Sequence, residues 1–380
     1  MLRRPLLAAP LLALTLAGLP APGLANECPP PGEWQRDGDA VPADALMREL
    51  ATRRVVLLGE QHKRLAHHRW QLHTLAALHA HQPDLAIGLE MLPRSAQPAL
   101  DAWVAGELDV ATFLEDSGWR EAWGYDPALY LPILHFARMH RLPLLALNVA
   151  PALRRRLSQQ GWDAVPPAQR HHLTPPAPPS SEYVDSLTEI HARHPEDPDN
   201  PNGLEDFIDA QLVWDRAMAE ALAQATEHAS LVVGLMGEGH IRHGHGVPHQ
   251  LHDLGIEAQR TLLAWSPPQE CPPPEAVADA LFGLGDEAPH EPEAPPRLGV
   301  LLVPNEAGIR IDRVAPGSVA AASGLSENDV IVLAAGRPLD TVEQLVAIIR
   351  RQPPGTLLPL EIVRDGEVRE ILARFPAETL

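Results

Sequence analysis

Short apolar runs alternate with longer amphipathic stretches over the first two thirds of the chain. Runs this short and this apolar are typical of strands buried in a parallel sheet. The runs that predict strands are Arg54–Leu58, Leu85–Leu89, Leu144–Asn148, Leu231–Met236 and Ala258–Ala264, and helical spacing follows in Leu65–His81, Gln97–Ala105, Leu129–His140 and Leu204–Ala225. The alternation predicts an α/β domain at residues 44–265, with a mostly parallel or mixed sheet flanked by helices.

The pattern changes after residue 265. Residues 266–296 are rich in proline and acidic residues, which predicts a stiff linker with a short helix at Glu275–Phe282. Residues 297–375 carry short strands around one helix, Thr341–Arg351, which is typical of a small α+β domain. The proline-rich, polar segment Pro166–Pro201 predicts a long excursion or lid outside the core.

Composition agrees with two domains. The chain has 380 residues, 45% of them hydrophobic, which is ample for two packed cores. The formal net charge is −20, which argues against non-specific binding of nucleic acid or anionic lipid. After the N-terminus no stretch has the eighteen or so apolar residues that a membrane span requires.

The N-terminus predicts export. Residues 1–25 combine Arg3 and Arg4, the apolar core Leu6–Ala17 and the small-residue site Gly23–Ala25, as a cleavable signal peptide does. The residues before Cys28 lack the pattern of a lipoprotein signal, so we expect a periplasmic or secreted protein that is not lipid-anchored. In such a compartment Cys28 and Cys271 could form a disulfide, which spacing alone does not decide.

The tetrapeptide Gly-Glu-x-His occurs twice, 178 residues apart, at Gly59–His62 and Gly237–His240. Each copy directly follows a predicted strand. Ligands of open α/β sheets collect beyond the carboxyl ends of strands, so the two loops would bring Glu60, His62 and His240 to one edge. A metal site, an acid/base pair or a cofactor cradle would use such groups.

Eleven of the 19 histidines fall in the two windows that these loops begin. We expect His67, His68, His73, His79 and His81 to lie on a solvated helix face, and His243, His245 and His249 at the surface. Glu90 closes the second predicted strand and would face the same edge, unless it pairs locally with Arg94. Asn148 ends its strand in the same way.

The first domain resembles the ChaN family of haem-binding proteins, within a superfamily that includes Tiki proteases and erythromycin esterases. The resemblance is carried by Val56–His62, Gly88–Leu92, Ala146–Asn148, Gln211–Ala219 and the Gly237–His240 loop. It implies an active centre of His62, Glu90 and His240, with Glu60 beside them.

The same resemblance implies a bound haem, with a homodimer as one way of holding it. Iron needs an axial ligand such as His or Tyr, and Tyr125 and Tyr130 lie in the aromatic-rich segment Trp119–Tyr130. That segment suits a haem wall, although ordinary core packing is the more expected role of Trp119 and Trp123. Our predicted cofactor site therefore comprises Glu60, His62, Glu90, His240, Tyr125 and Tyr130.

The second domain resembles a bacterial PDZ domain over its whole length. Arg313–Ala320, Ala322–Leu325 and Asn328–Ile331 carry the likeness. Leu298, Gly299 and Val300 match the loop that binds a peptide carboxylate, which implies recruitment of peptide C-termini.

Three functions stay open. The chain could bind haem or iron and recruit partners through the PDZ domain. It could be a hydrolase in which His62, Glu90 and His240 activate water, either without a metal or on a divalent ion held by Glu60, His62, Glu90 and His240. It could also be a non-catalytic adaptor.

Overall fold

The computed structural model describes residues 28–170, 173–193, 202–266, 269–286, 296–305 and 307–377. The chain divides into two compact units, Met1–His290 and Glu291–Leu380, which are described separately below. The predicted signal peptide lies outside the described residues.

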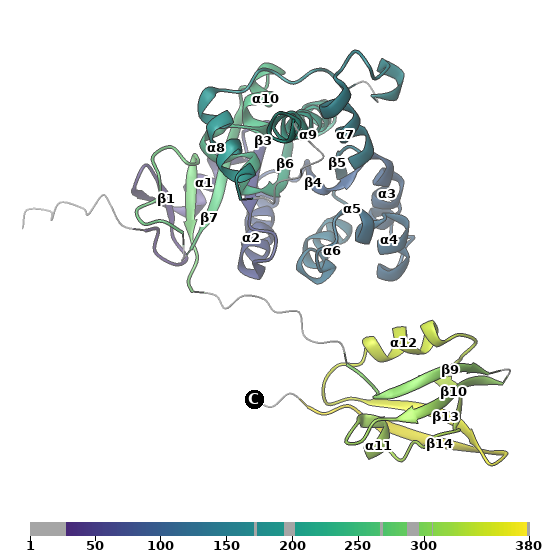
Figure 1. Cartoon of the computed structure of the whole chain (residues 1–380). Coiled ribbons are helices and arrows are strands. Elements are labelled where there is room, and N and C mark those ends of the chain that lie inside the picture. Colours follow the sequence, from purple (N-terminus) through teal and green to yellow (C-terminus); the bar gives the residue numbers. More distant parts are fainter. Residues whose placement is uncertain are drawn as a thin grey trace, which may run out of the picture. The chain divides into compact units, whose positions relative to one another are not determined.

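The first unit is built on one sheet with the strand order β2-β1-β8-β7-β3-β6-β4-β5 in the described part of the chain (Figure 1). From β8 to β5 the neighbouring strands run parallel, while β1 pairs antiparallel with β2 and β8. The strands are β1 Trp34–Arg36, β2 Asp39–Val41, β3 Val55–Glu60, β4 Leu85–Pro93, β5 Leu144–Asn148, β6 Leu231–Gly237, β7 Gln259–Trp265 and β8 Ala280–Gly283.

Both faces of this sheet are buried, which explains why its strands are apolar without alternation. In β3, Val56 and Leu58 enter one hydrophobic cluster, and Val55 and Leu57 enter another on the opposite face. All four side chains are completely buried. Successive residues of a strand point to opposite faces, so a strand covered on both sides must be apolar at every position.

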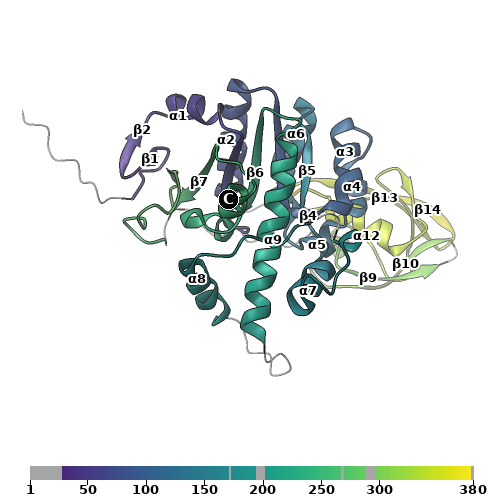
Figure 2. The same cartoon turned by 90° about the horizontal axis from the view of Figure 1, so that it is seen from above.

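Helices cover the two faces. The cluster on one face includes side chains of the first six helices, and α9 and α10 contribute to the cluster on the other face, with α7 packed on α9 (Figures 1 and 2). The helices are α1 Ala43–Leu50, α2 Leu65–His81, α3 Gln97–Ala105, α4 Val110–Asp116, α5 Trp119–Ala122, α6 Leu131–His140, α7 Pro151–Gln160, α8 Ser181–His191, α9 Gly203–Ala225 and α10 Val247–Asp253.

A strand forms at each of the five predicted positions, and α2 and α3 have the predicted bounds. Two predictions were wrong. The segment Pro166–Pro201 is not only an excursion, because it contains α8, whose Tyr183 and Leu187 are buried. The helix predicted at Glu275–Phe282 is absent; β8 occupies its end and joins the main sheet beside β7.

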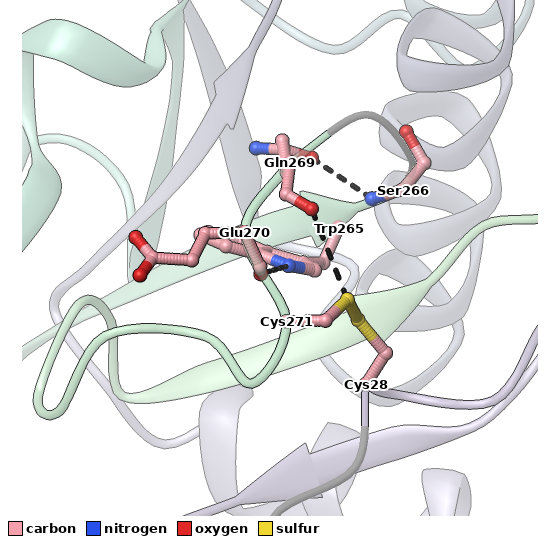
Figure 3. The surroundings of a disulfide bond; sticks show 6 residues. All are labelled: Cys28, Trp265, Ser266, Gln269, Glu270 and Cys271. Atoms are coloured by element: carbon pink, nitrogen blue, oxygen red, sulfur yellow. Dashed lines mark hydrogen bonds between the residues drawn. A yellow bond between two sulfur atoms is a disulfide. The ribbon is translucent and has the colours of Figure 1, made fainter.

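Cys28 and Cys271 form a disulfide, with their Cα atoms 5.3 Å apart (Figure 3). The turn that carries Cys271 is fixed nearby: Trp265 Nε1 donates to the Glu270 carbonyl, and Ser266 N donates to Gln269 Oε1. The bridge ties the start of the described chain to the segment that follows β7. The pairing that the sequence left open is therefore present.

The second unit is an antiparallel sheet with the order β14-β13-β11-β10-β9, and β12 pairs with β11. Its elements are β9 Val300–Asn305, β10 Gly308–Val314, α11 Val319–Ala322, β11 Val330–Ala334, β12 Arg337–Pro338, α12 Val342–Arg350, β13 Leu357–Arg364 and β14 Glu367–Arg374. Leu345 and Ile349 of α12 are buried in a hydrophobic core that is made by residues of this second unit. The expected fold class, an α/β unit followed by a small α+β unit, is confirmed.

None of the described helices combines the length and apolar character that crossing a bilayer would demand.

Candidate functional site

The strand order creates the site. Along the chain β3 is followed by β4 and much later by β6, but in the sheet β6 lies between the other two. Glu60, the last residue of β3, is the register partner of Gly237 at the end of β6, and Glu90 lies near the end of β4. A change in strand order of this kind opens a crevice at the carboxyl edge of a parallel sheet.

Glu60 is the centre of a first polar cluster. Its side chain is buried, and its Oε1 accepts from Tyr130 OH at 3.0 Å and from His62 Nδ1 at 2.8 Å. His68 Nε2 lies 3.5 Å from the second oxygen, Oε2, and 3.0 Å from the His62 carbonyl. Glu60 thereby fixes the orientation of the His62 ring and leaves Nε2 as the nitrogen directed away from the carboxylate.

Glu90, His240 and Asp215 form a second array, in which all three residues are buried. Glu90 Oε2 accepts from Gly237 N at 2.6 Å, and Glu90 Oε1 lies 3.5 Å from His240 Nε2. On the other side of the ring, His240 Nδ1 is 2.6 Å from Asp215 Oδ1. The array ends at Tyr183, whose hydroxyl donates to Asp215 Oδ2 at 2.7 Å.

This array holds charge away from water. Burial opposes the charge on His240, but Glu90 and Asp215 together raise its pKa to about 10. Burial works against ionisation of Glu90 too, yet the positive His240 keeps the Glu90 pKa below its usual value. For Asp215 burial prevails over His240 and Tyr183, and its pKa is raised. Glu90 and His240 thus form an ion pair at neutral pH.

His62 opens toward solvent between aromatic rings. Its side chain is 27% exposed, and its ring centroid lies 4.7 Å from that of Trp123 and 5.2 Å from that of Tyr125. Burial lowers the His62 pKa, but the hydrogen bond and charge of Glu60 outweigh it, so the pKa is raised. Burial raises the Tyr125 pKa, and the charges of Glu60 and Glu90 add to this effect. We call His62, Trp123 and Tyr125 the mouth of the site.

Arg154 and Trp214 cover the other side of His240. The guanidinium of Arg154 lies 4.0 Å above the Trp214 ring, and the Trp214 ring meets His240 edge-on at 4.9 Å. Burial lowers the Arg154 pKa, and Glu90 opposes this shift. Within the described part of the chain, the guanidinium of Arg154 has no hydrogen-bond acceptor or ion-pair partner, and the stacking on Trp214 is its recorded contact.

The two Gly-Glu-x-His loops do meet, but they are not equivalent. Gln61 Nε2 of the first loop donates to Glu238 Oε1 of the second at 3.3 Å. Glu238 also accepts from Arg242, so it does not hold His240 as Glu60 holds His62. The carboxylates that contact His240 of the second loop are instead Glu90 of β4 and Asp215 of α9.

The expected positions of two histidines were wrong, and two alternatives that the sequence left open are decided. His67 and His68 are buried rather than solvated; burial is the main reason why the His67 pKa falls to about 3. Glu90 does not pair with Arg94, which donates to the Ala217 carbonyl and lies near Glu220. Trp119 is buried, in keeping with ordinary core packing.

Asn148 and the later histidines of the second window lie where the sequence predicted them. Asn148 reaches the site, since its Nδ2 donates to the Glu90 carbonyl at 3.2 Å. His243 is exposed, and His245 and His249 are partly exposed. Tyr130 is buried against Glu60, so only Tyr125 of the two predicted tyrosines lies at the mouth.

Three residues of the site escaped prediction. Asp215 and Trp214 lie in Gln211–Ala219, a stretch that marked the family resemblance without suggesting a role. Tyr183 lies in the segment interpreted as an excursion. A buried acid in the middle of a helix was the available signal for Asp215, because such a residue requires a partner.

The side chains do not converge on one point as metal ligands would. Both nitrogens of His240 face carboxylates, which raise the His240 pKa to about 10, so at neutral pH neither nitrogen offers a lone pair. Among the described residues no group of three or more His, Cys, Asp or Glu is placed to hold a metal ion. The divalent-metal alternative is therefore unsupported.

The second unit carries a groove of about 610 Å³ between β9 and α12. It begins at the loop of Leu298, Gly299 and Val300, and Val346 and Ile349 line its other side. Gly299 has φ of +80°, a left-handed conformation that turns the loop. The three residues predicted to bind a carboxylate are thus at the groove.

The fold and the site define a two-module protein, in which an α/β unit with a buried acid–imidazole site precedes a small α+β unit with a groove beside its edge strand. A model of the family described as "Haem-binding uptake, Tiki superfamily, ChaN" matches residues 46–251, and a PDZ domain model matches residues 296–373. The chain belongs to this ChaN family and carries a PDZ domain.

The chain is similar to several known proteins. The solved structure "Cofacial heme binding to ChaN of Campylobacter jejuni" is 16% identical and covers 64% of this chain and 92% of its own, with a TM-score of 0.50. "Magnetosome formation protease MamE" of Paramagnetospirillum magneticum is 37% identical over 76 residues, which are 20% of this chain but only 10% of that protein. The HtrA3 PDZ domain bound to a phage-derived ligand is 24% identical and covers 20% of this chain and 82% of its own, with a TM-score of 0.19.

Proposed function

We propose that this protein binds haem at the mouth of the site, with His62 and Tyr125 as the donor side chains that face it. The observation that carries the proposal is the anchoring of His62 by the buried Glu60. A carboxylate that accepts from Nδ1 fixes the tautomer with its lone pair on Nε2, which is the form that binds iron. Family membership and the cofacial haem binding of ChaN from Campylobacter jejuni support the same ligand.

The residues present suit such a group. Trp123 and Tyr125 offer flat apolar surface beside the imidazole, and Tyr125 adds a phenol oxygen. Haem iron accepts either His or Tyr as an axial ligand. Bound haem would supply an iron centre for binding or electron transfer. His240 and Tyr130 were also predicted as cofactor residues. Their role would be indirect: His240 would hold Glu90 in place, and Tyr130 would hold Glu60.

A haemin titration tests the proposal. We expect a saturable Soret shift for the wild-type chain, and loss of most of the affinity when His62→Ala and Tyr125→Phe are combined. The two single variants tell the donors apart, because imidazole and phenolate ligands give different visible spectra. His73→Ala, an exposed histidine of α2, is the matched control. The absence of a saturable shift at micromolar haemin would overturn the proposal.

A hydrolase is the second candidate, favoured by one observation. Glu90 Oε1 is buried without a hydrogen bond to any described residue, while its carboxylate stays ionised beside the protonated His240. Glu90 would take a proton from an attacking water, and His240 would give one to the leaving group. A panel of esters and peptides tests this: Glu90→Gln should lower any rate by about 100-fold or more.

We also propose that the PDZ groove recruits peptide C-termini in the periplasm or in another oxidising compartment. The groove at Leu298, Gly299 and Val300 supports recruitment, and the Cys28–Cys271 disulfide supports such a compartment. Binding of a labelled peptide with a free carboxylate, but not of its amide, is the expected result. The homodimer stays a prediction, to be checked by mass with and without haemin.

A further inference from the structure

The groove of the PDZ domain has an unusual charge for this chain. The sequence has 50 acidic residues against 30 basic ones, yet the charged side chains that line the groove are three arginines, Arg297, Arg313 and Arg350. No acidic residue of the described chain lines it. Arg313 and Arg350 are exposed, and none of the three arginines forms an ion pair with another described residue.

The edge of the sheet shows where a bound peptide would lie. β9 pairs with β10 on one side and is the last strand of its sheet in the described chain, so its other side is open to an added strand. Such addition is the usual mode of PDZ recognition, in which backbone hydrogen bonds give affinity and side-chain pockets give specificity.

Successive side chains of β9 face opposite sides. Val300 and Leu302 pack toward the core of the domain, whereas Leu301 is 52% exposed. Arg313 of β10 is the register partner of Leu301 and therefore shares its outward face. An added strand would follow the same alternation. Its last side chain would enter the apolar part of the groove, and the residue before it would face Leu301 and Arg313.

We propose that the groove selects peptide C-termini that have an apolar last residue and an acidic residue directly before it, with Arg313 as the specificity-determining side chain. Leu298, Val346 and Ile349 form the apolar pocket. Arg297 and Arg350 also line the groove and would attract the terminal carboxylate whatever the peptide sequence. The selection rests on the proposed recruitment of peptide C-termini and names its substrate class.

Fluorescence anisotropy on the full chain tests this with four decapeptides of otherwise identical sequence. Three end in Glu-Val, Gln-Val and Lys-Val, and the fourth is the Glu-Val peptide with an amidated C-terminus. We expect the Glu-Val peptide to bind up to about fivefold more tightly than the Gln-Val peptide, a gap typical of an exposed ion pair, and the Lys-Val peptide to bind more weakly than both. High salt should narrow the gap.

Two variants sharpen the result. Arg313→Glu should reverse the order of the Glu-Val and Lys-Val peptides, whereas Arg337→Glu, an exposed position on β12 outside the groove, should leave it unchanged. Equal binding of the Glu-Val and Gln-Val peptides, with no binding of the amide, would overturn the selectivity but leave recruitment intact. If no free C-terminus bound better than the amide, recruitment itself would fail, and the selectivity with it.

Discussion

Nδ1 of His240 lies 2.6 Å from Oδ1 of Asp215, and both side chains are buried. This contact joins the second Gly-Glu-x-His loop to the middle of α9, a helix on one face of the sheet. Because Glu90 lies against the opposite nitrogen of the ring, His240 is an imidazolium between two carboxylates. Its charge is a structural element of the site.

The raised pKa of His240 predicts a pH dependence of stability. An unfolded histidine titrates near 6.5, and the folded value is about 10. The folded state therefore binds the proton more tightly. The stabilisation is fully present below about pH 6.5 and is lost as the pH rises toward 10. Guanidinium unfolding at pH 6, 8 and 10 should show a falling free energy of unfolding.

The matched variant is His240→Gln, which removes the titrating group. Its free energy of unfolding should depend less on pH over the same window, after the other groups common to both proteins cancel. Parallel curves for the two proteins would contradict an imidazolium at this position.

Tyr183→Phe tests how α8 is attached. The hydroxyl of Tyr183 donates to Asp215 Oδ2, so its removal leaves a buried carboxylate oxygen without that donor. We expect a loss of about 1–3 kcal/mol in the free energy of unfolding. Hydrogen exchange should also become faster in α8. Thr188→Val, at an exposed position of the same helix, is the control and should change neither measurement much.

The sheet of the first unit was largely predictable because β3, β4 and β6 are buried on both faces and so form apolar runs that stand out. Its edge was not. β8 is a four-residue strand, too short for a periodic signal, and it follows a proline-rich segment that resembles a linker. Register with β7 and β1, which only the folded sheet supplies, makes it a strand.

The site was predictable where a strand end carries a polar residue, as at Glu60, Glu90 and the His240 loop. Asp215 and Tyr183 were not, since they come from helices and reach the site by tertiary packing alone. The burial of His67 and His68 escaped prediction for a related reason. A histidine on an amphipathic helix is usually solvated, and here Glu60 and the backbone of the first loop supply buried partners.

Gly237→Ala should disturb His62 while leaving the sheet intact. A Cβ at Gly237 would lie 2.8 Å from His62 Cε1 and 3.2 Å from Nε2, so the imidazole must move away from its position. We expect weaker haemin binding with little change in the free energy of unfolding. Gly239→Ala, two residues later in the same loop, meets nothing within 4 Å and should bind haemin as the wild type does.

The Cys28–Cys271 disulfide closes a loop with a sequence separation of 243 residues. A bridge over so long a loop restricts the unfolded chain strongly, and its loss typically costs about 2–5 kcal/mol. The double variant Cys28→Ser/Cys271→Ser should show this loss in guanidinium unfolding. Dithiothreitol should lower the stability of the wild type but leave that of the double variant unchanged. Equal stability of the two proteins without reductant would contradict a stabilising bridge.

Gly299→Ala should prevent the Leu298–Val300 loop of the PDZ domain from binding a peptide carboxylate. A Cβ at this position would collide with the Ser318 side chain, whose Oγ is 2.9 Å away, and φ of +80° adds strain of about 1–2 kcal/mol. Gly317→Ala is the matched control, because φ there is +71° and a Cβ would meet nothing within 4 Å. Both variants carry similar backbone strain, and Gly299→Ala should lose the more stability because its Cβ also displaces Ser318. Only Gly299→Ala should lose affinity for the Glu-Val decapeptide. Equal affinities would show that the peptide carboxylate binds elsewhere, because the steric conflict at the loop is the one difference between the two substitutions.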